Sequence, residues 1–456
     1  MNKSIKKIST LTLMLLTIAA IANLRGLPSN AEQGMQLIFY LGLAAVLFLI
    51  PTALVSAELA TGWKGGIFDW VKQAYGDRWG FVAIWLQWIQ NVVWYPTVLA
   101  FLSGALAYFI NPNLSSNGPF IAIVILVVYW GSTIISLRGI KFAAIFSNTG
   151  VLLGTLIPGA IIISLGILYF LQGRPPAIDI NAADIIPKDI SLPVMVFLVG
   201  MLLNYAGIEM NAVHARDMKD PKKSFPLAVF LAAFIIVSLF ILASLAIALV
   251  IPADKLSLTA GVIDAYKIFF DVYNIGWAVY PMAVLLVFGV IAAVITWISG
   301  PSRGLLRVSE EGYLPRVLQK VNRHGVQNRI LFVQGVIVSL LALLFAFLPN
   351  VSGSYWLLTA MSVQLYLLMY ILMFLTVFKL RKTQPNVKRA YKVPVLIAIG
   401  GIGLFTSIGG FLLGFVPPDL WTGSTIEYIA ILIAGIVALG VGPFIFYALR
   451  RPSWKR

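Results

Sequence analysis

The chain has 456 residues, of which 60% are hydrophobic and 11% are charged, with a formal net charge of +16 and no cysteine. A soluble globular protein of this length does not need so much apolar surface, so most of the chain must face lipid. The lack of cysteine excludes disulfides and thiolate metal sites. The two histidines, His214 and His324, lie in different parts of the chain, so we expect neither a metal nor another cofactor.

Twelve apolar runs are long enough to span a hydrocarbon layer about 30 Å thick, which takes roughly 20 residues. In chain order they cover approximately 8–32, 35–60, 79–110, 119–137, 142–171, 190–215, 224–251, 274–300, 327–348, 355–379, 393–416 and 425–449. We therefore predict an all-α integral membrane protein with twelve transmembrane helices. Three lysines precede the first run, as in a signal peptide, but no cleavage site of small residues follows it. We expect this run to be retained as the first helix.

Basic residues alternate between the two sides of this predicted topology. Most of the 33 lysines and arginines lie in the two terminal segments and in every second loop. The positive-inside rule then places both termini in the cytoplasm, and we expect a multi-pass protein of the plasma (inner) membrane. The positive charges are spread over short segments without a folded basic domain, so we do not expect nucleic-acid binding.

Two of the predicted helices contain residues that interrupt a helix. The first predicted helix contains "NLRGLPSN" (23–30), and the sixth contains "NYAGIEMN" (204–211). Each stretch also holds a charge, Arg25 or Glu209, which is costly inside a bilayer. Gly207 could also serve only to let two helices pack closely. A charge beside a break instead favours a functional interruption.

An interrupted helix gives a cavity two kinds of polar backbone. A half-helix that begins inside the membrane presents N–H groups and a positive dipole end, and one that ends there presents carbonyl groups. Together they can hold an anion and a cation side by side, which suits an amino acid zwitterion. Irregular backbone is tolerated at this depth only where it lines a cavity or is buried in protein.

The interrupted spans are the first and the sixth, so their starts are five spans apart. This spacing predicts two five-helix repeats of opposite orientation, covering 8–171 and 190–379, and two additional helices over 393–449. No stretch is long enough for a separate soluble domain, so residues 1–456 form a single membrane domain.

Three longer stretches resemble a known family. They are "GGIFDWVKQAYGDRWGF" (65–81), "NYAGIEMNAVHARDMKDPKKSFPLA" (204–228) and "GPSRGLLRVSEEGYLPRVLQKVNRHGVQNR" (300–329). They resemble the amino acid–polyamine–organocation (APC) transporter superfamily and, within it, the bacterial glutamate/GABA antiporter family, over about residues 8 to 449. The resemblance implies a LeuT-like fold and an amino acid antiporter that works by alternating access.

The resemblance also implies site residues, in a substrate path between spans one, three, six, eight and ten. Matched by position, the family's residues fall on Tyr205 and Glu209 in span six, Trp297 in span eight, and Tyr366 and Tyr370 in span ten. The two span-ten tyrosines are four residues apart, so they share one helix face, although such a stripe can also serve packing. With the residues at the breaks, the candidate substrate-binding residues are Arg25, Gly26, Tyr205, Gly207, Glu209, Trp297, Tyr366 and Tyr370.

Arg25 has three interpretations. Its guanidinium could bind a substrate carboxylate in two-pronged fashion. It could pair with Glu209 or Glu58 and hold the broken helices in place, or it could extend to water. Glu209 could likewise take a proton, bind the substrate's ammonium group or pair with Arg25, and His214 near it could titrate or lie at the interface.

Three functions remain open at this level. The leading one is amino acid antiport, with glutamate/GABA-like exchange. The second is a proton-coupled amino acid or polyamine importer, and the third is a non-transporting receptor or scaffold. No enzyme motif accompanies them. The sequence departs from the known exchangers at "NLRGLP" and, we expect, lacks their C-terminal plug, so neither the substrate nor the oligomeric state is carried over from them.

Overall fold

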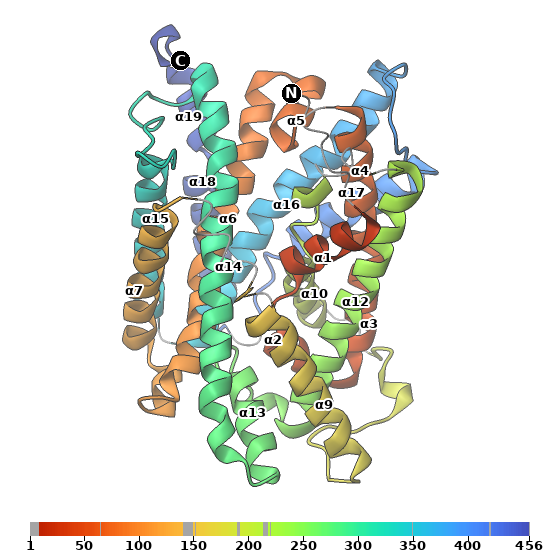
Figure 1. Ribbon diagram of the computed structural model, residues 1–456, viewed down its shortest axis with the longest axis vertical. Helices are drawn as coiled ribbons and strands as arrows, with labels where there is room; N and C mark the ends of the chain where they lie inside the picture. Colours follow the sequence, from red (N-terminus) through yellow and green to blue (C-terminus); the bar gives the residue numbers. More distant parts are fainter. Residues whose placement is uncertain are drawn as a thin grey trace.

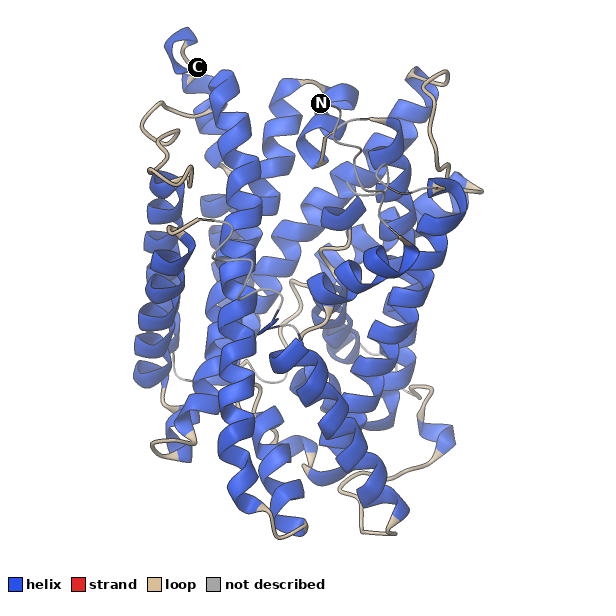
Figure 2. Cartoon of the chain, viewed as in Figure 1, coloured by secondary structure: helices blue, strands red, loops and turns tan. Residues whose placement is uncertain are grey.

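The structure is a computed structural model that describes residues 9–63, 65–139, 149–150, 152–188, 192–212, 218, 220–348, 350–418 and 421–455. The regular elements in these ranges are helices (Figure 2). His214 and its neighbours 213–217 lie outside the described residues.

The N-terminal half contains eight α-helices among the described residues. They are α1 (Thr10–Ile21), α2 (Leu27–Ala31), α3 (Leu37–Ala44), α4 (Ile50–Gly62), α5 (Ile67–Tyr75), α6 (Asp77–Ala107), α7 (Gly118–Ser136) and α9 (Ile157–Leu171). Shorter 3-10 or π turns accompany them: η1 (Gly34–Gln36), η2 (Ala45–Leu49), η3 (Pro112–Ser116), η4 (Leu152–Leu156) and η5 (Ala182–Asp184).

The described residues of the second part form ten α-helices. They are α10 (Leu192–Tyr205), α11 (Glu209–Ala212), α12 (Pro221–Val250), α13 (Gly261–Val272), α14 (Val279–Val308), α15 (Asn328–Phe347), α16 (Val351–Thr383), α17 (Leu396–Leu413), α18 (Thr425–Gly440) and α19 (Gly442–Leu449). Its short turns are η7 (Ala253–Lys255), η8 (Gly276–Ala278), η9 (Ser309–Tyr313) and η10 (Pro452–Trp454).

Ten helical segments of the described chain are long and apolar enough to cross a membrane. They correspond to ten of the twelve predicted runs, and the other two runs are the ones that contain the interruptions. Large apolar side chains on these helices are exposed on the outside of the bundle, such as Phe347 on α15, Phe405 on α17 and Ile426 on α18. Exposed apolar surface of this extent needs lipid around it. The chain is therefore a multi-pass helical membrane protein.

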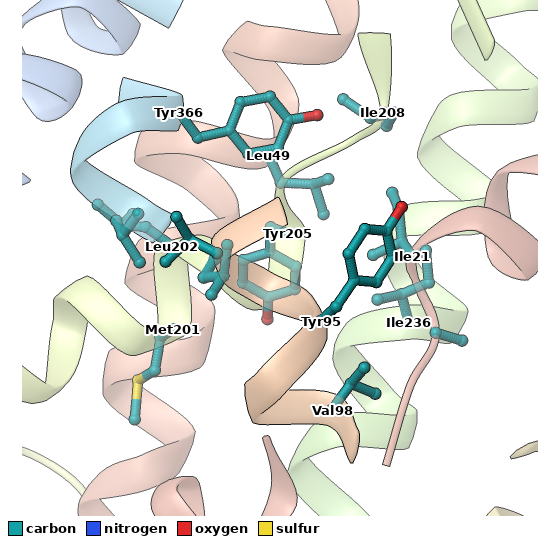
Figure 3. Packing of buried hydrophobic residues seen from close by; sticks show 14 of the residues in the cluster. Ile21, Leu49, Tyr95, Val98, Met201, Leu202, Tyr205, Ile208, Ile236 and Tyr366 are labelled. Carbon is teal, nitrogen blue, oxygen red and sulfur yellow. The ribbon is translucent and has the colours of Figure 1, made fainter. Parts of the chain in front are cut away.

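The interior of the bundle is built around α6. This helix packs along α16 and α14, and also against α5 and α7. Its side chains belong to the same buried cluster as those of α10 and α16, and Figure 3 shows Tyr95 of α6 together with Leu202, Tyr205 and Tyr366. The polar residues of α6 are consequently held inside the protein, away from lipid.

The two ends of the bundle differ. Helix α5 and the end of the described chain after α19 lie at one end, while α13 and the far end of α9 lie at the other (Figure 1). We call these the α5 end and the α13 end. The α5 end carries basic segments, for which the sequence predicts a cytoplasmic location.

Candidate functional site

A cavity of about 330 Å³ lies between the two interrupted helices and helices α6, α14 and α16. Its polar and aromatic lining includes Arg25, Asn91, Trp94, Asn204, Trp297 and Tyr366. Cavities of about 300–1,000 Å³ lined by apolar groups and a few polar ones are typical small-molecule sites. We call this the central cavity.

The first interruption covers residues 22–26, between α1 and α2. Pro28 lies in the first turn of α2, where the missing N–H costs no helical hydrogen bond. Gly26 lies against α10, because a Cβ there would come within 2.8 Å of Asn204 Cγ. Asn204 Nδ2 also donates to Asn30 Oδ1 on α2 at 3.2 Å. Glycine at position 26 thus allows α2 and α10 to meet next to the cavity.

Arg25 lies in this interruption and is only 3% exposed. Its Nη1 donates to three hydroxyl groups, at 3.0 Å to Tyr355, 3.3 Å to Thr97 and 3.4 Å to Thr359. Its Nε is buried without a hydrogen-bond partner. Hydroxyl oxygens solvate the cation without neutralising it.

Neither carboxylate considered as a partner for Arg25 is paired with it. Glu58 instead binds Arg381 and Arg389 near the α5 end, and Glu209 accepts hydrogen bonds from neutral groups. In the part of the chain that the structure describes, Arg25 makes no ion pair. A buried cation lines the central cavity with its charge uncompensated by these residues.

The second interruption separates α10 from α11. Gly207 has a φ of +106°, a conformation that side chains disfavour, and its N–H donates to the Tyr370 hydroxyl at 2.8 Å. Glu209 follows at the start of α11 and is 2% exposed. Its Oε1 accepts from Tyr366 at 2.6 Å and from Gln87 at 3.0 Å. Its Oε2 accepts from Tyr370 at 2.5 Å.

The two α16 tyrosines share one face, as their spacing predicts. Their ring centroids are 4.7 Å apart, and both hydroxyls meet Glu209, so the pair is more than a packing stripe. Tyr366 also lines the central cavity. Trp297 faces it from α14, with its ring centroid 6.2 Å from that of Trp94 on α6. Aromatic walls therefore close one side of the cavity.

Tyr205 is oriented differently from the other predicted site residues. Its hydroxyl donates to the Leu41 carbonyl of α3 at 3.1 Å, and its ring packs against Phe240 of α12 (Figure 3 shows Tyr205). These contacts hold α10 in place. Within the described residues no group of three or more His, Cys, Asp or Glu side chains could hold a metal ion.

Glu209 borders a second, smaller cavity of about 200 Å³, toward the α5 end. Gln87 borders it from α6. Met210, Gly300 and Pro301 border both cavities and form the wall between them. We call this space the inner cavity.

Several polar residues of the site were not predicted from the sequence. The hydroxyls around Arg25 come from Thr97 on α6 and from Tyr355 and Thr359 on α16. Nothing in their local sequence indicates this role. Gln87 and Asn91 did carry a signal, because they are polar residues four apart in a predicted span and so lie on one helix face.

Comparisons with known proteins agree with this architecture. Residues 8–439 match the family model described as amino acid permease. The chain is 40% identical to an uncharacterized transporter of Legionella pneumophila over 98% of this chain and 97% of that protein. It is 35% identical to a glutamate/gamma-aminobutyrate antiporter of Lactococcus lactis, over 97% of this chain and 91% of that protein. A probable agmatine/putrescine antiporter of the same species is 23% identical, over 98% and 96%.

Proposed function

The chain belongs to the amino acid permease family, and from this premise we propose that it exchanges glutamate, or a closely related acidic amino acid, for γ-aminobutyrate across the plasma membrane. It is a transporter and not an enzyme. The proposal rests on the relatives that carry the glutamate/gamma-aminobutyrate antiporter name over almost the whole chain, and on one feature of the central cavity.

That feature is the buried guanidinium of Arg25. A guanidinium binds a carboxylate through two parallel N–H···O bonds, and Arg25 keeps an unpartnered Nε at the cavity while hydroxyls hold Nη1. The side-chain carboxylate of glutamate corresponds to the single carboxylate of γ-aminobutyrate, so both substrates carry this group. Agmatine and putrescine have none. The site therefore favours amino acid exchange over polyamine exchange.

We assign the remaining candidate residues supporting or binding roles. Trp297 and Tyr366 form the aromatic wall of the central cavity, and Glu209 attracts the substrate's ammonium group. Gly26 allows α2 to approach α10, and Gly207 supplies the left-handed backbone at the second break. Tyr205 and Tyr370 position α10 and Glu209, respectively, through their hydroxyls.

The proposed membrane arrangement follows from the helices. Ten segments can cross the membrane, and each interrupted pair, α1 with α2 and α10 with α11, supplies one further span. We propose twelve spans, with five-helix repeats over 8–171 and 190–379 in opposite orientation, LeuT-like, and two more helices over 393–449. Both termini and the α5 end then face the cytoplasm.

Substitution of Arg25 by lysine tests the assignment. An ammonium cannot reproduce the two-pronged contact, and loss of one charge-assisted hydrogen bond costs about 1.5–3 kcal/mol, roughly 10- to 150-fold in affinity. Purified Arg25→Lys protein should lose glutamate and γ-aminobutyrate binding by that factor and retain a neutral α-amino acid. Arg174→Lys, at an exposed arginine of the α13 end, is the matched control. Equal losses for all ligands would show that Arg25 only supports the fold.

Counterflow separates exchange from proton-coupled import. Uptake of labelled glutamate into proteoliposomes should require an internal amino acid. Uptake into empty vesicles driven by a pH gradient would support the proton-coupled importer instead. Retention of binding without any flux would support a receptor.

A further inference from the structure

The inner cavity contains two charges that the central site does not use, on Asp69 and Arg307, and it also borders Glu209. Its lining comes from the start of α5, from α6, from α11 and from the last turns of α14. Three of the residues that border it are charged: Glu209 at its deep end, and Asp69 and Arg307 toward the α5 end. We infer that the inner cavity is a second, cytoplasmic binding site for an amino acid zwitterion, with its ammonium on Glu209 and a carboxylate on Arg307.

Arg307 is free to change partners. Its Nη1 lies 3.9 Å from Asp69 Oδ2, at the outer limit of an ion pair, and its side chain is 68% exposed. An exposed pair of this kind contributes little stability, so an incoming carboxylate can replace Asp69 at low cost. The neighbouring charges are already engaged, since Lys72 pairs with Glu311 at 3.0 Å and with Asp77 at 3.3 Å.

Glu209 can still accept an ammonium group. The groups that donate to its carboxylate, the two tyrosines and Gln87, are neutral. They leave its negative charge in place, at a position that borders the inner cavity.

The dimensions of the inner cavity suit a small zwitterion. Arg307 is seven residues beyond Gly300 on α14, which corresponds to about 10 Å along the helix, and an arginine side chain can cover part of that distance. Gly304 keeps the space open between them, because a Cβ there would come within 3.0 Å of Ile84 Cδ1. The volume of about 200 Å³ is enough for one small amino acid.

This site rests on the proposed function, because it acts as a waypoint for the exchanged amino acid. Substrate that passes the wall at Met210 and Pro301 would bind here before it reaches the cytoplasm. Its removal should change transport kinetics at one face of the membrane and leave the other face unchanged.

Sided kinetics in proteoliposomes test the inference. The chain contains no cysteine, so Ser453→Cys in the exposed tail allows orientation to be measured with an impermeant thiol reagent. In Arg307→Gln the half-saturation concentration for glutamate at the cytoplasmic face should rise about 10-fold, the size expected for a lost charge-assisted hydrogen bond. The value at the external face should not change. Gly304→Val, which fills the cavity without touching a charge, should give the same one-sided effect.

Arg303→Gln is the matched control, because Arg303 lies one turn earlier on the same helix, is exposed and borders neither cavity. Equal shifts at both faces, no shift, or the same shift in Arg303→Gln would overturn the inference. The unchanged external value also confirms that the variants are folded.

A binding measurement separates failure of this site from failure of the proposed exchange. Trp70 borders the inner cavity, so glutamate bound there should alter the part of the tryptophan fluorescence that Trp70→Phe removes. If wild-type protein shows this signal and Arg307→Gln loses it, the site stands even where no exchange is detected. If wild-type protein exchanges glutamate but gives no Trp70-dependent signal, the exchange stands and the inner site is refuted.

Discussion

Glu58 is fully buried at the end of α4 and binds groups in the last turn of α16 and in the segment that follows it. Its carboxylate accepts from Arg381 Nε at 2.9 Å and Nη2 at 2.5 Å, from Arg389 Nη1 at 3.2 Å, and from the Val393 N–H at 2.7 Å. Gly62 leaves room for this arrangement, because a Cβ there would come within 2.8 Å of Arg389 Cγ. One carboxylate therefore fastens the 384–395 segment to α4.

The substitution Glu58→Gln measures the strength of that attachment. Glutamine keeps one acceptor oxygen, but it turns an NH₂ group toward the donors and leaves both arginines without a counter-charge. Removing one partner of a buried ion pair costs about 3–5 kcal/mol. Arg381 is 22% exposed on its side chain and Arg389 is 5% exposed, so water relieves the first more than the second. We therefore expect a cost at the lower end of this range, about 3 kcal/mol. This corresponds to a roughly 100-fold shift in the equilibrium between the attached and the open state of the 384–395 segment.

Hydrogen exchange reports this change directly. The Val393 amide donates to Glu58, so a peptide that contains it should exchange about 100-fold faster in Glu58→Gln, while peptides of α6 should not change. Glu427→Gln, at an exposed acidic residue of α18, is the control and should have no effect beyond about 0.5 kcal/mol. The double variant Glu58→Gln/Arg389→Gln should recover part of the protection, because it removes one uncompensated charge. Unchanged exchange at Val393 in Glu58→Gln would refute the assigned role of this carboxylate.

Three further predictions concern other parts of the chain. Burial raises the pKa of Asp264 on α13 above its usual range near 3.9, although the Tyr108 hydroxyl that donates to it opposes the shift. Asp264→Asn keeps an oxygen that accepts from Tyr108 but cannot ionise. The variant and wild type should therefore have the same thermal midpoint below about pH 4, and the variant's midpoint should become the higher of the two as pH rises above that value. Equal midpoints at pH 8 would contradict this. Gly207→Ala places a side chain at a φ of +106° and should cost about 1–3 kcal/mol of stability and reduce exchange, whereas Gly131→Ala, at a helical glycine with open space around it, should cost nothing. A reporter fused after the last residue should be cytoplasmic and one inserted at 113–117 external; the opposite pattern would refute the proposed topology.

The interruptions were predictable because their cause is local. Arginine, glycine and proline within four residues cannot continue an apolar helix, and the structure ends α1 before Arg25 and begins α2 after Gly26. The shared face of Tyr366 and Tyr370 follows in the same way from helix geometry. Features with a period or a backbone preference can be derived from neighbouring residues alone.

The partners of the charged groups were not predictable, because they depend on how distant helices cross. Glu58 and Arg389 are separated by 331 residues along the chain, and no local pattern brings them together. Pairing Arg25 with Glu58 or Glu209 was a reasonable hypothesis from charge alone. In the structure Glu58 pairs with two other arginines, Arg381 and Arg389. The opposite charges that the sequence suggests as partners are therefore not the ones that meet in space.

The two buried charges at the breaks share a property that bears on transport. Arg25 donates to neutral hydroxyls and Glu209 accepts from neutral hydroxyls and an amide. A single charge inside a bilayer costs about 2.5–3.5 kcal/mol on insertion scales, and hydroxyl dipoles lower that cost while leaving the net charge in place. If the two residues paired with each other, a substrate would have to break a buried ion pair, at about 3–5 kcal/mol, before it could bind. Because hydroxyls can rotate or yield to a stronger partner, each charge stays available, and an amino acid that carries the opposite charges gains most from entering.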